Sequence, residues 1–316
     1  MHPALSVIFF TVTSGAGFGL YSLTAVLQLF RLGPSLDRTQ LLVALVTSLV
    51  LIIAGLLSST GHLANPKNAW RSFMRVKTSW LSREAVLAVA FFPFAFLYLI
   101  GVIFYGAHVP IFFVTMGLIG IIFGFITVFA TGMIYACLKT MRQWNTPLVP
   151  ANYLLMGLTL GALIHMAIEA YFGADLQFIS GVAGTALVMT GVMKGIYYFW
   201  IDRVSGPTIN TATTFTRARV RLLDTGHTAG TFLTEEFGYQ ISEGLRSVLR
   251  TLVFVLGFIL PLILVALAAY LAPGAGAFAL AVTAVVSSYV GKMIERWLFF
   301  AEARHVVNLY HGAQHT

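Results

Sequence analysis

GHLANPKNAWRSFMRVKTSWLSRE, residues 61–84, is the stretch that decides how this chain is arranged. It lies between two long apolar runs and holds five of the chain's 19 Lys and Arg side chains. It also holds two tryptophans, a residue type that is enriched where a membrane meets water. A basic, aromatic segment of this kind predicts a loop at a membrane surface, with the rest of the chain forming the scaffold inside the membrane.

The composition supports a membrane scaffold. Of the 316 residues, 58% are hydrophobic and only 9% are charged, whereas a soluble domain has about 25% charged residues. The sequence therefore predicts an all-α, polytopic membrane protein with eight transmembrane helices, which we expect to form two four-helix bundles within one integral membrane domain, residues 1–316. No run alternates as a barrel strand would. The expected spans are about 5–30, 41–60, 85–105, 110–138, 149–170, 177–199, 248–271 and 275–298.

The distribution of positive charge predicts the orientation. With these spans, 17 Lys and Arg fall on the side of loops 61–84, 139–148 and 201–247, against Arg31 and Arg38 on the other side. The positive-inside rule then places both termini and the three loops in the cytoplasm. The net charge of +8 belongs to this asymmetry, and we expect no nucleic acid partner.

Three features of the helices can be predicted from residue type. Gly15 and Gly19 are spaced for close helix packing. Lys194 and Lys292 lie near helix ends, where their long side chains are expected to reach the lipid headgroups. The charged tail from Lys292 to His305 is expected to extend the eighth helix out of the bilayer as an amphipathic segment.

Within residues 61–84, Asn65-Pro66 predicts the start of a short helix lying in the membrane interface, and Ser82 is expected to cap the third span. Glu84 would then lie in that span's first turn, where the helix dipole favours a carboxylate and no function is needed. Similarly, His62 could simply close the second span with a polar residue.

Together, however, His62 and Glu84 suit a lipid-soluble quinone. They border the same pair of helices, and quinone chemistry needs a hydrogen-bonding partner and a proton acceptor connected to water. The chain itself has no obvious electron carrier. Its one cysteine, Cys137, cannot form an iron–sulfur cluster, and only His165 lies deep in a span, so we expect no haem and no other metal. Electrons must therefore come from a partner, for which the basic loops are the natural docking surface.

The chain resembles the dimethyl sulfoxide reductase anchor subunit family nearly from end to end. The matching stretches are MHPALSVIFFT at 1–11, SGAG at 14–17, GHLANP at 61–66, AWR at 69–71, SWLSRE at 79–84 and ERWLFFAEARH at 295–305. Each motif alone is modest, whereas their order and spacing together are specific. The family's His-Leu-Gly-x-Pro motif falls on His62, with Ala64 in place of the glycine, and the family's glutamate at the start of the third helix falls on Glu84.

The resemblance implies a non-catalytic, eight-helix anchor of the bacterial inner membrane, with no catalytic residue of its own. Its partners would be a four-cluster iron–sulfur subunit and a molybdopterin catalytic subunit, and it would exchange electrons with menaquinone or ubiquinone without a haem. Such complexes act in anaerobic electron transport on dimethyl sulfoxide or related oxides, or oxidise sulfite. The quinone-site residues expected are His62 and Glu84, and Arg71, Trp70, Trp80 and Arg83 are expected to shape the pocket or the docking surface.

Two other functions remain compatible with the sequence. A secondary transporter could use His165 and Glu169 as an ion or proton path. However, the two halves of the chain show no matching pair of broken helices. A purely structural anchor would hold its partners without contacting quinone.

Overall fold

Long helices dominate this computed structural model, which describes residues 3–62, 65–215, 217–224 and 229–316 and, for His62 and Pro66, the backbone alone. Among these residues, eight helices are long and apolar enough to cross a membrane, which confirms the predicted all-α class with eight spans. They are α1 (Leu5–Leu29), α2 (Arg38–Ser59), α3 (Trp80–Tyr105), α4 (Ile111–Ala136), α5 (Leu148–Tyr171), α6 (Gln177–Ile201), the continuous α9–η3–α10 (Glu243–Tyr270) and α11 (Ala275–Ala301). The described ranges contain no strand, only an isolated bridge between Thr208 and His315.

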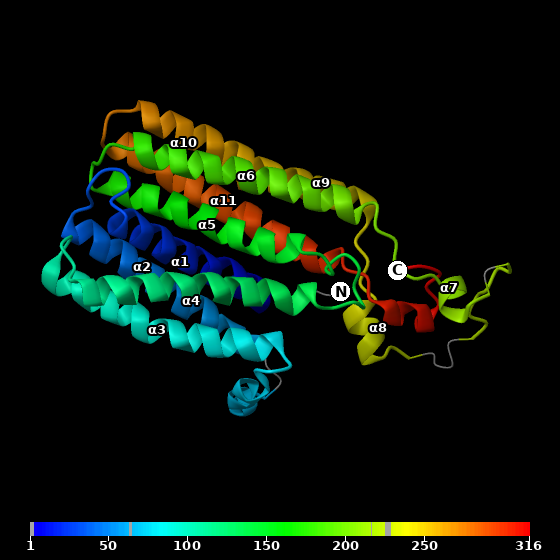
Figure 1. The fold of residues 1–316 in the computed structure, drawn as a ribbon. Helices are drawn as coiled ribbons and strands as arrows, with labels where there is room; N and C mark the ends of the chain where they lie inside the picture. Colours follow the sequence, from blue (N-terminus) through cyan, green and yellow to red (C-terminus); the bar gives the residue numbers. More distant parts are fainter. Residues whose placement is uncertain (1–2, 63–64, 216, 225–228) are drawn as a thin grey trace.

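The helices run side by side, so the bundle has two ends that differ in their loops (Figure 1). At the short-loop end, brief connections join α1 to α2, α3 to α4, α5 to α6 and α10 to α11. All other connections and both chain ends lie at the opposite, long-loop end. The small elements there are η1 (Thr60–His62), η2 (Pro66–Arg75), α7 (Ile209–Thr213), α8 (Phe232–Phe237) and η4 (Val306–His311).

The predicted glycine packing is present between α1 and α5. A Cβ atom on Gly19 would lie 2.0 Å from the carbonyl oxygen of Gly157, and one on Gly161 would lie 2.3 Å from the carbonyl carbon of Gly19. Both contacts are with backbone atoms, so only glycine allows the two helices to approach this closely. Because α1 and α5 pack from Gly15 to Thr24, the first four spans are not separate from the last four, and the expected division into two four-helix bundles is not confirmed.

The seventh span contains a π-helical turn, η3 (Val255–Ile259), between α9 and α10. Gly257 in this turn faces Gly291 of α11, where a Cβ atom would lie 2.3 Å from the Gly257 amide nitrogen. Side chains of α11 bond the carbonyl groups of the turn, because Ser287 donates to Leu256 at 2.8 Å and Ser288 donates to Gly257 at 3.1 Å. The irregular turn is therefore fixed against α11, as buried backbone groups require.

Candidate functional site

The start of α3 differs from the prediction. Ser79, and not Ser82, caps the helix, since the Ser82 amide donates to the Ser79 hydroxyl at 3.4 Å. The Ser82 hydroxyl instead donates to the Ser72 carbonyl and accepts from the Arg75 amide at 3.0 Å, which fastens η2 to α3. Glu84 consequently lies beyond the first turn, so the helix dipole does not account for a carboxylate at this position.

Glu84 is buried inside the bundle, with 5% of its surface exposed, and accepts a hydrogen bond from the Thr131 hydroxyl of α4. It lines a narrow crevice between α1, α2, α3, α4 and α5, called here the Glu84 crevice, which has room for about one water molecule. Its lining comprises Phe10, Thr11, Ser14, Gly15, Phe18, Leu56, Glu84, Thr127, Val128, Thr131 and Tyr153. A carboxylate in such a place is expensive to bury, which marks the position as a candidate site.

Trp70, Arg71, Trp80 and Arg83, which were also predicted as site residues, do not line this crevice. The side chain of His62 lies outside the described residues, although its backbone, in η1, directly follows α2. Trp70 is exposed, and the Arg71 guanidinium lies 5.8 Å from the centre of the Trp70 ring. Trp80 packs on Phe129 of α4 with ring centres 6.1 Å apart.

Arg83 also points away from Glu84. Its guanidinium donates to the carbonyl groups of Val76 and Lys77, both at 2.9 Å, and lies 4.3 Å from the centre of the Trp80 ring. Arg83 therefore holds the turn between η2 and α3. Of the predicted residues whose side chains are described, only Glu84 reaches the crevice.

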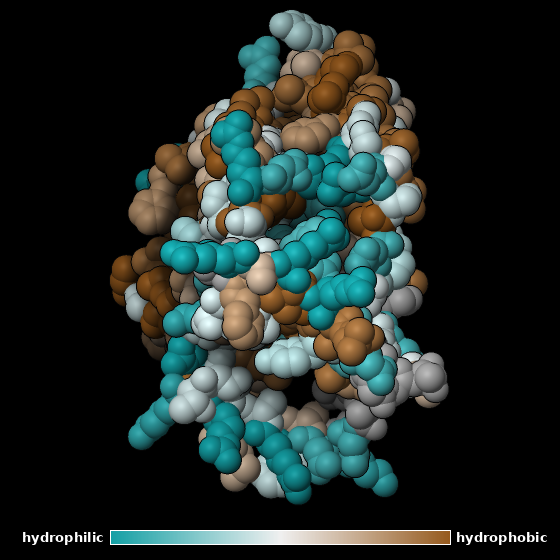
Figure 2. Space-filling model, turned by 90° about the vertical axis from the view of Figure 1, so that its right-hand side faces the viewer, coloured by the Kyte–Doolittle hydropathy of each residue, from teal (hydrophilic) through white to brown (hydrophobic). Residues whose placement is uncertain are grey.

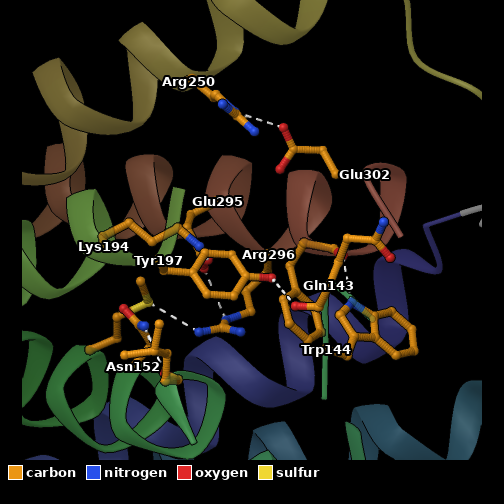
Figure 3. Close-up of polar contacts among 12 residues, drawn as sticks. Gln143, Trp144, Asn152, Lys194, Tyr197, Arg250, Glu295, Arg296 and Glu302 are labelled. Carbon is orange, nitrogen blue, oxygen red and sulfur yellow. Dashed lines mark hydrogen bonds and ion pairs between the residues drawn. The ribbon is translucent and has the colours of Figure 1, made fainter. Parts of the chain in front are cut away.

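A second polar region was missed by the sequence analysis. Lys194 of α6 and the neighbours Glu295 and Arg296 of α11 form a buried ion cluster, with 1%, 1% and 3% of their surfaces exposed (Figure 3). Lys194 is hydrogen-bonded to Glu295, and the Arg296 Nε lies 3.1 Å from the second Glu295 oxygen. The expectation that Lys194 reaches the lipid headgroups is wrong, because its ammonium is buried and pairs with the Glu295 carboxylate.

Lys292 likewise turns inward. Its ammonium donates to the Ser288 hydroxyl at 2.6 Å and to the Gly257 carbonyl at 3.3 Å, and it has 1% of its surface exposed. The expectation of a headgroup contact is wrong here too, since the carbonyl of the π-helical turn accepts from it instead. The expected amphipathic extension from Lys292 to His305 is also wrong, because α11 ends at Ala301 with its charged residues buried.

Aromatic side chains surround the buried ion cluster. The Arg296 guanidinium lies 3.8 Å from the centre of the Tyr153 ring, and the Lys194 ammonium lies 4.0 Å from that of Tyr197. Tyr197 donates to the Gln143 carbonyl at 3.1 Å. Tyr153 also lines the Glu84 crevice, so the same side chain contacts both the buried ion cluster and the crevice.

At the long-loop end, Arg250 joins two carboxylates near the surface. It donates to both oxygens of Asp202, at 2.7 and 2.9 Å, and to Glu302 at 2.7 Å. These hydrogen bonds hold the pKa of Asp202 below its usual range. Burial has the opposite effect on Glu302 and raises its pKa. The arrangement clamps the ends of α6 and α11 to α9.

One further buried pair, His165 and Glu169, lies on α5. His165 Nε2 is 3.0 Å from a Glu169 oxygen, and His165 Nδ1 is 3.0 Å from the Thr24 hydroxyl. The contact with Thr24 joins α5 to α1. Nowhere in the described part of the chain do three His, Cys, Asp or Glu side chains gather as metal ligands would.

Hydrophilic side chains cover most of the long-loop end, while apolar side chains cover the flanks of the helices (Figure 2). This arrangement, with a buried carboxylate in an internal crevice, defines a class: a multi-pass helical membrane protein with one polar face and an intramembrane polar site. Residues 1–301 match the family model described as "DMSO reductase anchor subunit (DmsC)", and the chain belongs to that family.

Among curated proteins, the chain is 35% identical over 326 aligned positions to a sulfite dehydrogenase subunit of Allochromatium vinosum. The alignment covers 98% of this chain and 99% of that protein. No solved structure matches the chain. The expected family is therefore confirmed, and with it the role of membrane anchor subunit of an oxidoreductase complex.

Proposed function

We propose that this anchor subunit binds quinone or quinol at Glu84 and exchanges electrons with an iron–sulfur partner at the long-loop end. The observation that carries the proposal is the burial of the Glu84 carboxylate in a crevice between five helices, with one hydroxyl group as its hydrogen-bond donor. A carboxylate in this position can accept a hydrogen bond, and then a proton, from a quinol hydroxyl. We propose that His62, which follows α2, contacts a headgroup oxygen and connects the site to water.

The crevice must widen to admit a quinone ring, since it has room for only about one water molecule. Leu56, Phe10 and Phe18 are the largest apolar side chains that line it. Rotation of such side chains would open the crevice without moving a helix, and their apolar surface suits an isoprenoid tail.

The orientation and the docking face are part of the same proposal. Loops with many Lys and Arg residues face the cytoplasm in membrane proteins, so the long-loop end is assigned to the cytoplasmic side of a bacterial inner membrane. Its hydrophilic surface (Figure 2) suits a soluble partner carrying four iron–sulfur clusters, and through it a molybdopterin catalytic subunit. Trp70 and Arg71, exposed on η2, are assigned to this docking face.

The substrate of the complex is proposed to be sulfite. The support is the match over nearly the full length of both chains to a sulfite dehydrogenase subunit. In that case electrons flow from the partner to the quinone, which is reduced with two electrons and two protons. A reductase for dimethyl sulfoxide would run the same site in the opposite direction.

A pulldown from native membranes in mild detergent tests the anchor role. We expect iron and molybdenum to copurify with this chain, together with quinone-coupled sulfite oxidation. Sulfoxide reduction instead would overturn the assignment of sulfite. A metal-free single chain would contradict the proposed partners.

Glu84→Gln tests the quinone site itself. We expect an assembled complex whose quinone turnover falls at least about tenfold, an effect in the range of a lost acid–base group. The matched control is Glu243→Gln, which changes an exposed glutamate of α9 at the same end of the bundle. Equal quinone kinetics in the two variants would remove Glu84 from the site.

A further inference from the structure

The hydroxyl groups of the Glu84 crevice are not equivalent. Ser14 donates to the Phe10 carbonyl at 2.7 Å, Thr11 to Ile8 at 3.1 Å and Thr127 to Phe123 at 2.7 Å. Thr131 donates to Glu84 itself. The Tyr153 hydroxyl is the exception, because it has no hydrogen-bond partner of ordinary geometry among the described residues, although only 4% of the Tyr153 surface is exposed.

A buried tyrosine normally finds a partner for its hydroxyl. Tyr153 is prevented from turning toward one, because its ring is packed on several sides. It stacks on Tyr135, with ring centres 6.0 Å apart, and meets the edge of Phe299, also at 6.0 Å. The Arg296 guanidinium covers the ring at 3.8 Å. The hydroxyl is thus fixed at the crevice with two polar neighbours, the Arg296 guanidinium, which cannot accept a hydrogen bond, and the Tyr135 hydroxyl. Its own hydrogen therefore remains available to a ligand.

The buried ion cluster is what holds Arg296 over this ring. Glu295 contacts the Arg296 Nε at 3.1 Å, and the Met156 sulfur accepts from its Nη2 at 3.1 Å. Lys194 in turn is hydrogen-bonded to Glu295 (Figure 3). With two basic side chains and one acidic side chain, the cluster favours negative charge nearby, in a region of low dielectric constant where such effects are strong.

We propose that Tyr153 is a further headgroup ligand, beside Glu84 and His62, and that its hydroxyl donates a hydrogen bond to a quinone oxygen. The inference rests on the proposed function. Glu84 can accept a hydrogen bond from the quinol form, whereas Tyr153 can donate one to an oxygen of either form of the ring. Tyr153 binds and orients the ring and transfers no proton. Arg296 acts through Tyr153 as a positioning residue, and its charge favours electron density on the headgroup oxygen.

Tyr153→Phe, in the intact complex in native membranes, tests this role. Removal of a buried hydroxyl that makes no hydrogen bond of ordinary geometry among the described residues should leave assembly unchanged. The matched control is Tyr21→Phe, because the Tyr21 hydroxyl is also buried without a hydrogen-bond partner in the described part of the chain but lies outside the crevice. The assay follows the sulfite-dependent reduction of decylubiquinone and of menadione, and measures KM and kcat separately.

We expect the Tyr153→Phe variant to raise the KM for at least one of the two quinones about tenfold, which corresponds to one lost hydrogen bond. The Tyr21→Phe variant should stay within about twofold of the wild type. Equal KM values in the two variants for both quinones would overturn the proposal. If Glu84→Gln is normal as well, the quinone site fails; if Glu84→Gln is impaired and Tyr153→Phe is not, only the role of Tyr153 fails.

A measurement without substitution complements the variants. Infrared difference spectra of the wild-type complex, with tyrosine labelled by ¹³C, should show a shifted phenol C–O band when decylubiquinone is added. The same band should be missing from the difference spectrum of the Tyr153→Phe variant. An identical tyrosine signal in both proteins would contradict a hydrogen bond from Tyr153.

Discussion

Two regions of the molecule hold Lys and Arg side chains in opposite environments. In the surface segment, residues 65–79, the charged side chains Lys67, Arg71, Arg75 and Lys77 are exposed to solvent. In the buried ion cluster, Lys194, Glu295 and Arg296 are almost completely enclosed by helices. Both regions contain Lys and Arg, but the free-energy consequences differ, because an enclosed charge depends on its partner and an exposed charge is stabilised by water. Substitutions in the buried ion cluster should therefore change the free energy of unfolding much more than substitutions in the surface segment.

The largest effect is expected for Glu295→Gln. Loss of this carboxylate leaves Lys194 and Arg296 buried without a counter-charge, which should lower the free energy of unfolding by about 3–5 kcal/mol. Denaturant titration of the purified protein in detergent measures the change. Glu235→Gln, at an exposed position of α8, is the control and should change stability by less than about 0.5 kcal/mol. Similar losses in both variants would erase the contrast between the regions.

A double substitution sharpens the same point. Lys194→Met combined with Glu295→Gln removes one cation together with the carboxylate, so fewer charges remain unpaired. We expect the double variant to be more stable than Glu295→Gln alone, by about 1–3 kcal/mol. A double variant that is less stable than Glu295→Gln would show that Lys194 contributes through packing and not through charge.

A smaller effect is expected where the surface segment enters α3. Ser79→Ala removes the helix cap and should lower the free energy of unfolding by about 1 kcal/mol. Ser72→Ala is a matched control, because the Ser72 hydroxyl donates to a carbonyl within its own helix, that of Ala69, at 2.6 Å. If Ser72→Ala costs as much as Ser79→Ala, the cap is not what stabilises this junction.

Asp202→Asn tests a charge pair of intermediate exposure, and its expected cost is below about 1 kcal/mol near neutral pH. Because Arg250 lowers the pKa of Asp202 in the folded protein, the stabilisation is present above the usual carboxyl pKa of about 4 and disappears as pH falls through the lowered value. Unfolding free energies of both proteins between pH 7 and pH 3 check this. A difference that does not shrink with acid would contradict the ion pair.

The smallest effect is expected for Arg71→Gln, which should change stability by less than about 0.5 kcal/mol because this guanidinium is exposed. Its effect should appear instead as weaker copurification of the partner subunits, if η2 belongs to the docking face. Intact copurification together with a large loss of stability would show that Arg71 stabilises the fold and does not belong to the docking face.

The sequence was sufficient to predict the number of spans and the close packing at Gly15 and Gly19. Both predictions depend only on local sequence, namely the length of the apolar runs and the spacing of small residues. It was not sufficient for Lys194, Lys292 or Glu295. Helical spacing gives the face on which a residue lies, but not whether that face meets lipid or another helix. Their partners come from helices distant in sequence, so the inward orientation was visible only in the folded chain.

The site was predicted unevenly for the same reason. Glu84 was predicted because it borders the same pair of helices as His62 and because its motif resembles a family pattern, yet the predicted cap at Ser82 placed it in the wrong turn of α3. Tyr153 could not be predicted as a site residue from the sequence. It is one of 12 tyrosines, and no charged residue lies next to it in the sequence. A deep His165 was noticed, and the structure pairs it with Glu169.

The close packing of α1 on α5 has a consequence for biosynthesis. α1 is the most buried span and one of the least apolar, yet it is synthesised before α5. The backbone surface at Gly15 and Gly19 and the hydroxyl of Thr24 therefore face lipid, or an insertion factor, until more than a hundred further residues have been made. The segment at the centre of the finished bundle is thus the one that depends most on later parts of the chain to remain in the membrane.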